Sequence, residues 1–142
     1  MKRLRRLVRL PVRERGALLS ALAWCSAASL AVRLFPFRRL AGYLGRHMAE
    51  SAHEQDPACR REARRIGWAV ATAARHLPWK PVCLPQAVAA QWMLRRLGIP
   101  STLYLGIDPK GNYDAHAWVR AGKEIVTGGP AIQRYAVVST FA

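Results

Sequence analysis

The first half of the chain carries apolar residues at the three- and four-residue spacing of helices. An uncharged run, residues 16–32, predicts a long helix over about residues 13–34, which Pro36 ends. A second apolar series recurs at helical spacing over residues 57–76, where arginines occupy the positions that face solvent. Residues 1–76 are therefore expected to form a helical N-terminal part.

The pattern changes at residue 77. Prolines in "LPWKPVCLPQ" exclude a regular helix until Pro85, which a first helical turn tolerates. Good helix formers follow, and Gly98 ends that helix. Three runs rich in β-branched and aromatic residues come next: "STLYLGI", "AHAWVR" and "EIVTG". This order predicts an α+β fold in which residues 77–142 place one helix on a small antiparallel sheet, in the same domain as residues 1–76.

Charge is divided unevenly between the two halves. The chain has 23 Lys and Arg against 8 Asp and Glu, and residues 1–80 hold 17 basic and 5 acidic side chains, a net charge of +12. Residues 81–142 have a net charge of +3. The basic half indicates a surface for a partner or a lipid, and the near-neutral half is the expected seat of chemistry. Basic and aromatic residues do not alternate on the strands, so no specific nucleic-acid partner is expected.

The uncharged run at residues 16–32 also allows a membrane interpretation. Its 17 residues are at the lower limit of a spanning helix, about 17–25, and serines and alanines make it only mildly apolar. We expect a helix buried in the domain. A helix lying on a membrane surface, supported by seven basic residues among the first fifteen, is the second interpretation, and a spanning helix the third.

The cysteines and histidines bear on location and on metals. The chain has three cysteines and no CxxC pair, which is typical of proteins of the reducing cytoplasm. We therefore expect a cytoplasmic protein, with association with a membrane as the alternative. Cys59, His47 and His53 lack the spacing of zinc ligands, and neither a metal nor a cofactor is expected. Cys25 and Cys59 are interpreted as inert.

Cys83 is the strongest candidate for chemistry. It stands at the predicted start of the second-half helix, where unpaired N–H groups and the helix dipole favour a thiolate. The same N–H groups can stabilise the oxyanion of an acyl-transfer intermediate. His116 is the only histidine of the strand-rich half, and helix followed by sheet can bring it near Cys83 as a base. On spacing alone, a buried structural cysteine and a structural histidine are the more common outcome.

The string "CLPQAVAAQWMLRRLGIPSTLYLGI…DAHAWVRAGKEIVTG" resembles the transglutaminase-like, papain-related leader peptidases of lasso-peptide biosynthesis. In that family C-L-x-x-A-x-A-x-x-x-L-L-R-x-x-G-I-P precedes an apolar strand and A-H-A-W-V. The match covers residues 78–142, and "RLFPFRRLAGYLG" at residues 33–45 resembles the family's helical part more loosely. The resemblance implies a papain/transglutaminase-like core in which Cys83 is the nucleophile and His116 the general base and later acid.

The resemblance also implies a function and partners. The reaction is removal of the leader peptide from a ribosomally synthesised lasso precursor through an acyl-enzyme. Members of this short form lack a leader-binding domain, which a separate small recognition protein supplies, and this chain has no room for one. The macrolactam-forming, ATP-using cyclase is a further expected partner. Acyl transfer to an amine, as in transglutaminases, is the second enzymatic hypothesis, and a non-catalytic basic membrane- or nucleic-acid-binding protein is the third.

One position departs from the family pattern. The family's third catalytic residue is an Asp on the strand after the histidine, and residues 127–129 hold no carboxylate. Such a residue orients the imidazole and stabilises its cation. The side chains considered for this role are Thr127, Gln133, Asp108 and Asp114. None is assigned, so the third member of the triad is left open.

Overall fold

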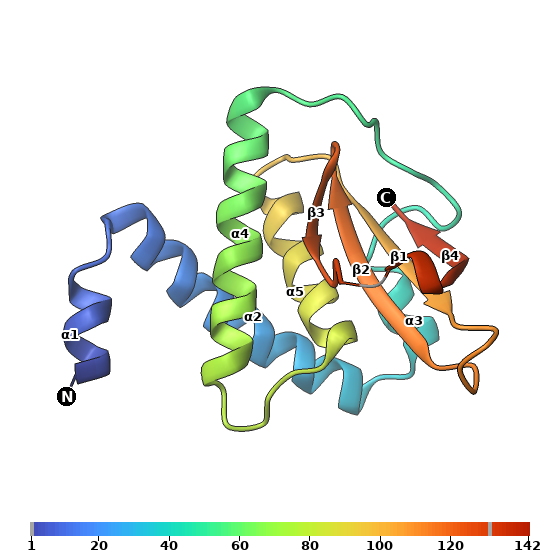
Figure 1. Cartoon of the computed structure of the whole chain (residues 1–142), viewed down its shortest axis with the longest axis horizontal. Coiled ribbons are helices and arrows are strands. Elements are labelled where there is room, and N and C mark those ends of the chain that lie inside the picture. Colours follow the sequence, from blue (N-terminus) through green and yellow to red (C-terminus); the bar gives the residue numbers. More distant parts are fainter. Residues whose placement is uncertain (1, 131) are drawn as a thin grey trace.

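The computed structural model describes residues 2–130 and 132–142, and the side chains of residues 5–130 and 132–142. The helices are α1 (Lys2–Val8), α2 (Val12–Leu34), α3 (Phe37–Ala41), α4 (Pro57–His76) and α5 (Cys83–Arg96). They precede β1 (Thr102–Ile107), β2 (Ala115–Ala121), β3 (Glu124–Thr127), the 3-10 turn η1 (Ile132–Arg134) and β4 (Ala136–Phe141). Figure 1 shows long helices packed beside an antiparallel sheet, which confirms the predicted α+β fold.

Prolines lie at or near the ends of helices α2 and α5. Helix α2 begins after Pro11 and ends before Pro36, close to the predicted residues 13–34. Helix α5 begins at Cys83, ahead of the predicted start at Pro85. A proline in the first turn removes no intrahelical hydrogen bond, so the helix can include residues before it.

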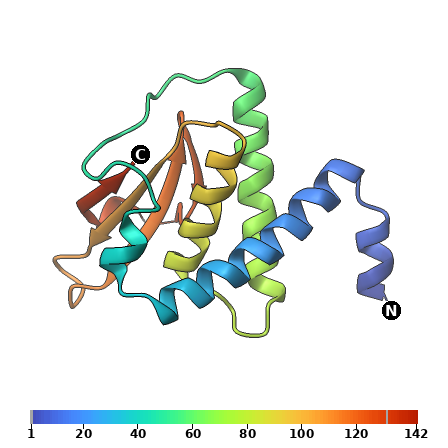
Figure 2. The same cartoon turned by 180° about the vertical axis from the view of Figure 1, so that it is seen from behind.

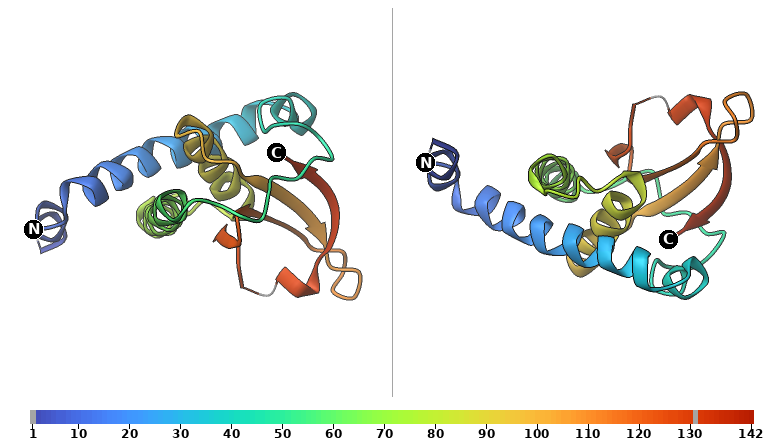
Figure 3. Two further views of the ribbon diagram at one scale, coloured as in Figure 1. Left: turned by 90° about the horizontal axis from the view of Figure 1, so that it is seen from above. Right: turned by 90° about the horizontal axis from the view of Figure 1, so that it is seen from below.

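The sheet has the strand order β3-β2-β1-β4, with antiparallel neighbours throughout. Strands β2 and β3 form a hairpin through Gly122, whose φ of +58° lies in the left-handed region. The chain then crosses a face of the sheet from β3 at one edge to β4 at the other (Figure 3). The sequence pattern misses β4, because the exposed Val137 and Val138 are consecutive and interrupt the two-residue alternation of a strand.

Helix α5 lies at the centre of the molecule. It contacts α2 and α4 on one side and the sheet on the other (Figures 1 and 2). Residues 87–90 are small and fully buried, which allows this close packing. Gln91 is also fully buried, and its Nε2 donates to the carbonyl oxygens of Leu44 and Phe141. Its Oε1 accepts from the Ser101 hydroxyl, so Gln91 ties α5 to two loops and to the end of β4.

Helix α2 buries one face only. Leu18, Ala21, Cys25 and Ala28 are buried, and the opposite face is exposed. Within the described residues, α2 is the helix that is long and apolar enough to cross a membrane, with a mean hydropathy of 1.6 over a window of which 28% is buried. Core helices and membrane helices both satisfy these criteria. The expectation of a helix buried in the domain therefore holds for one side of α2.

Candidate active site at the start of helix α5

Cys83 is the first residue of α5 and follows the proline-rich turn. Gln86 Nε2 donates to the carbonyl oxygen of Pro81 at 2.7 Å and so holds this turn against the start of the helix. The Cys83 side chain is half-buried and packs against the edge of the core. It is therefore not sealed in the interior.

The start of α5 leaves backbone N–H groups unpaired. Val82 occupies the N-cap position, and within the described chain no side chain caps this helix. Pro85 has no N–H, and the N–H of Gln86 already donates to the carbonyl oxygen of Val82 at 3.3 Å. The N–H groups of Cys83 and Leu84 consequently remain for an anion, at the positive end of the helix dipole.

His116 is the second residue of β2 and lies opposite Gly106 of β1. Side chains alternate along a strand, so Ala117 enters the core while His116 and Trp118 are on the other face. The His116 ring stacks on Tyr135, with centroids 4.8 Å apart, and on Trp118 at 5.9 Å. A Cβ on Gly106 would lie 2.9 Å from both Trp118 and Tyr135, so a glycine at this position is what allows the three rings to pack together.

The imidazole of His116 is oriented by a backbone carbonyl. Its Nε2 lies 2.8 Å from the carbonyl oxygen of Gly128. A carbonyl oxygen only accepts hydrogen bonds, so Nε2 carries the proton and donates it. The neutral ring is then the tautomer with an unprotonated Nδ1, the form that can accept a proton from a nucleophile. The Gly128 carbonyl takes the orienting part that the leader-peptidase pattern gives to an Asp side chain.

Gly128 fits this position because it has no side chain. Its φ of +70° lies in the left-handed region. A Cβ there would lie 2.6 Å from the carbonyl oxygen of Ala117, 2.9 Å from Trp118 Cβ and 3.1 Å from His116 Nε2. Any larger residue would push its own carbonyl away from the imidazole.

The side chains considered for the third position form no hydrogen bond with the imidazole in the described part of the chain. Asp108 accepts from Arg134 at 2.9 Å and from two backbone N–H groups, and the Arg134 bond above all holds the pKa of Asp108 below its usual range. Thr127 is buried with an unpartnered hydroxyl, and Asp114 and Gln133 are exposed. The family pattern predicts a carboxylate side chain at residues 127–129, whereas the structure has a main-chain acceptor in that same stretch. Its one sequence signal is the pair of glycines after "EIVT".

Cys83 and His116 belong to neighbouring elements, because α5 contacts both β2 and β3. No hydrogen bond joins the Cys83 thiol to His116, and His116 lies on the face of β2 that does not enter the core. Their contact would form at the margin of the core, near the end of β3, where Figures 1 and 3 show the start of α5. Catalytic hydrogen bonds are often long in free enzymes and tighten when substrate binds. The catalytic role of the pair stays a prediction.

The other two cysteines have different surroundings. Cys25 is fully buried in α2, and this burial raises the pKa of its thiol to about 11. Cys25 is therefore a neutral, unreactive thiol near pH 7. Cys59 lies in the first turn of α4, where the Asp56 carboxylate already caps the helix by accepting from the Ala58 N–H at 2.8 Å. Cys83 combines partial exposure with an uncapped helix start.

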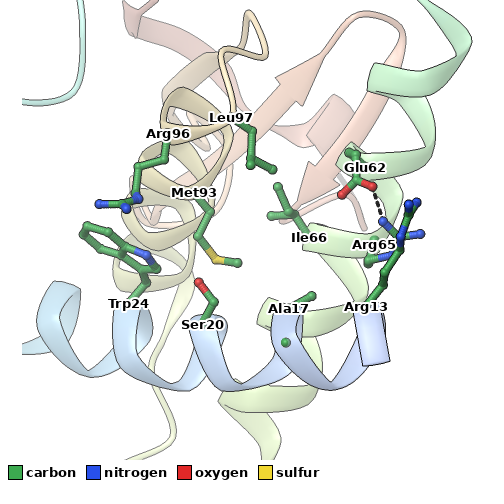
Figure 4. Close-up of a pocket in the computed structure, with 11 residues that line it drawn as sticks. Arg13, Ala17, Ser20, Trp24, Glu62, Arg65, Ile66, Met93, Arg96 and Leu97 are labelled. Carbon is green, nitrogen blue, oxygen red and sulfur yellow. Dashed lines mark hydrogen bonds and ion pairs between the residues drawn. The ribbon is translucent and has the colours of Figure 1, made fainter. Parts of the chain in front are cut away.

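A cavity of about 430 Å³ lies at the far end of α5 from this site, between α2 and α4 (Figure 4). Arg13, Arg65 and Arg96 line it. Glu62 pairs with Arg65, and the Arg96 guanidinium lies 5.9 Å from the centre of the Trp24 ring. Its position on the opposite end of the helix separates this cavity from the candidate active site.

A second hollow, of about 500 Å³, opens beside the candidate site. It lies between the β1–β2 loop and the segment before β4, and the Asp108–Arg134 ion pair and Tyr135 line it. Tyr135 also stacks on the His116 ring. The lining residues include neither His116 nor Cys83, so Tyr135 is the link between the hollow and the candidate site.

A family model of the Transglutaminase-like superfamily matches residues 31–140. The matched stretch runs from the end of α2 to β4 and contains both Cys83 and His116. No curated protein and no solved structure matches the chain. Members of this superfamily are in general cysteine peptidases and acyltransferases. Because the match covers most of the sequence, the chain belongs to the Transglutaminase-like superfamily.

Proposed function

We propose that this chain is a cysteine peptidase that removes the leader peptide from a ribosomally synthesised lasso-peptide precursor. Membership of the Transglutaminase-like superfamily supports acyl chemistry on a cysteine. The resemblance around Cys83 and His116 supports this substrate class. The observation that carries the proposal is the hydrogen bond from His116 Nε2 to Gly128, because it leaves Nδ1 available as a base.

Cys83 is the nucleophile of the proposed reaction. Its thiol proton passes to Nδ1 of His116, and the sulfur attacks the carbonyl carbon of the scissile peptide bond. The N–H groups of Cys83 and Leu84, at the uncapped start of α5, stabilise the oxyanion. The imidazolium then gives its proton to the departing amine, and the leader is held as a thioester on Cys83.

Water completes the proposed reaction. His116 takes a proton from a water molecule, whose oxygen attacks the thioester carbon. The C–S bond breaks, the leader leaves with a free carboxyl group, and the Cys83 sulfur regains its proton. One peptide bond and one water are consumed, and the core peptide gains a free amine. That amine is the group that the ATP-using cyclase would join into a macrolactam.

The hollow beside His116 provides the binding surface in this proposal. The residues next to the scissile bond would lie against Tyr135 and the β1–β2 loop. The separate small leader-recognition protein would hold the precursor and deliver it to this surface. The precursor and that protein are therefore the partners of the proposed function, with the cyclase as the next enzyme along.

Cleavage of a leader–core precursor, followed by mass spectrometry, tests the proposal. The purified chain is mixed with the precursor and the small recognition protein encoded beside it. Cys83→Ala should lower the cleavage rate at least about 10³-fold, and His116→Ala nearly as much, because the two act as a unit. Cys59→Ala, which removes another half-buried cysteine, is the matched control and should cleave normally. Retained cleavage by folded Cys83→Ala protein would reject the proposal.

The same acyl-enzyme can also react with an amine in place of water. The superfamily includes acyltransferases, so the cleavage assay is repeated with an added primary amine. The peptidase hypothesis expects the hydrolysed leader as the main product. A leader joined to the amine as the main product would favour acyl transfer and contradict the peptidase.

A further inference from the structure

The outer face of α2 carries an apolar strip that no described residue covers. Val12, Leu19, Leu30 and Leu34 are exposed by 75%, 61%, 57% and 64%. Their positions fall on one side of a helix with 3.6 residues per turn. Together with the exposed Ala23 and Ala27 between them, they form what we call the outer strip. It runs the length of a helix about 34 Å long.

The opposite face of α2 is anchored in the core. Leu18, Ala21, Cys25 and Ala28 are buried there, and α2 contacts both α4 and α5. A membrane-spanning orientation would pull this face away from α5 and expose the core residues that it covers. In the fold described here, α2 can therefore lie along a membrane but cannot cross it.

Basic residues stand at both ends of the outer strip. No charged residue interrupts residues 16–32. Arg9 precedes this stretch, and Arg33 and Arg38 follow it, all with exposed side chains. Arg13, also exposed, lines the cavity between α2 and α4. An apolar middle between basic ends is the pattern of helices that lie in the interface of an anionic bilayer.

We propose that the outer strip docks the chain on the surface of an anionic lipid bilayer, with α2 parallel to the membrane plane. The leucines enter the boundary between headgroups and acyl chains, and the arginines contact lipid phosphates. Phe35 and Phe37, exposed by 50% and 38%, extend the apolar contact beyond the end of α2. This inference does not depend on the proposed peptidase activity.

The distribution of charge argues against other occupants of the outer strip. A nucleic acid would need basic side chains along the contact, and the strip is uncharged over residues 16–32. A second copy of the chain would bring arginine-rich helix ends together in either relative direction, so like charges would oppose each other. A bilayer that contains anionic lipids matches both the apolar middle and the basic ends.

Flotation of the full chain with lipid vesicles tests this inference. Vesicles of phosphatidylcholine are compared with vesicles that also contain about 30% phosphatidylserine. The chain should bind the anionic vesicles at least about tenfold more strongly, and Leu19→Gln/Leu30→Gln should weaken this binding at least about tenfold. The matched control is Val137→Gln/Val138→Gln, which changes two apolar residues of β4 exposed by 50% and 53%, and it should bind as the unchanged chain does.

Several outcomes would overturn the inference. The chain could fail to bind anionic vesicles, or the Leu19→Gln/Leu30→Gln variant could bind them as strongly as the unchanged chain. The β4 control could also lose as much vesicle binding as the leucine variant. A self-associated form that the leucine variant abolishes, without vesicle binding, would assign the strip to a second copy. Leader cleavage without vesicles should be unchanged in the leucine variant, so this test is separate from that of the peptidase.

Discussion

His116 receives its orientation from a main-chain oxygen, 2.8 Å from Nε2, where the leader-peptidase pattern that the sequence resembles has an Asp carboxylate. Both acceptors select the same tautomer of the neutral ring. A carboxylate also stabilises the imidazolium that forms during catalysis, whereas a carbonyl supplies only a dipole. We therefore expect proton transfer at this site to be slower than in a triad with an Asp, while the ring remains equally well placed.

Replacing Gly128 tests this role. Gly128→Ala should lower the free energy of unfolding by about 2–4 kcal/mol, because the new Cβ meets backbone atoms at a left-handed φ. It should also lower leader cleavage at least about 10²-fold, because the acceptor for His116 moves. Cleavage is measured well below the unfolding temperature of the variant, so that lost folding does not account for lost activity.

Gly98→Ala is the control for backbone strain. Gly98 has a φ of +67°, close to that of Gly128, but a Cβ there would meet nothing within 4 Å. Gly98→Ala should lower the free energy of unfolding by about 1 kcal/mol and leave the rate of leader cleavage unchanged. Equal cleavage by the two variants would show that the Gly128 carbonyl does not serve the proposed reaction.

At the scale of elements, the position of β3 against α4 depends on one close approach. Gly67 of α4 lies so near β3 that a Cβ would be 2.5 Å from the carbonyl oxygen of Val126. The approach holds β3 against α4, and β3 also contacts α5. The helical periodicity of residues 57–76 predicted α4 but not this contact, because a helix pattern shows which face is buried and not how closely a strand lies against it.

Gly67→Ala should destabilise the fold, although alanine favours helices. The overlap with Val126 is expected to cost about 1–3 kcal/mol and to outweigh the gain of about 1 kcal/mol in helix propensity. Gly16→Ala is the matched control, because Gly16 is also helical and a Cβ there meets nothing within 4 Å. It should raise the free energy of unfolding by about 0.5–1 kcal/mol. Urea unfolding measures the free energy of unfolding of both variants. If both substitutions stabilise the fold, the close approach between Gly67 and Val126 is disproved.

At the scale of the whole molecule, ion pairs tie distant segments of a chain with a net charge of +15. Arg64 of α4 bonds Glu124 of β3 at 2.7 Å, and Arg134 of η1 bonds Asp108 at 2.9 Å. In each case the arginine hydrogen bond holds the pKa of the carboxyl below its usual range. Because the folded-state pKa is depressed, the stabilisation is fully present above the unfolded value and is lost as the pH falls through the folded value.

Acid should therefore reveal the contribution of Asp108. Asp108→Asn should be less stable than the unchanged chain near neutral pH, and the difference should shrink as the pH falls below about 4. Asp114→Asn, which removes the same charge at an exposed loop position, should show little difference at any pH. Urea unfolding at a series of pH values measures this. A difference that does not change with pH would mean that the Asp108 charge has no part in it.

The sequence by itself determined the long helices α2, α4 and α5, three of the four strands and the two residues expected to carry the chemistry, and it missed the short helix α3. Periodicity and proline positions report local backbone preference and which face is buried, and this information is present along the chain. Only the tertiary structure decided which atom accepts the hydrogen bond from His116. Every residue has a carbonyl oxygen, and the fold determines which of them lies next to the imidazole. It also decided which face of α2 is buried, because residues 16–32 carry no charged side chain that would mark the exposed face.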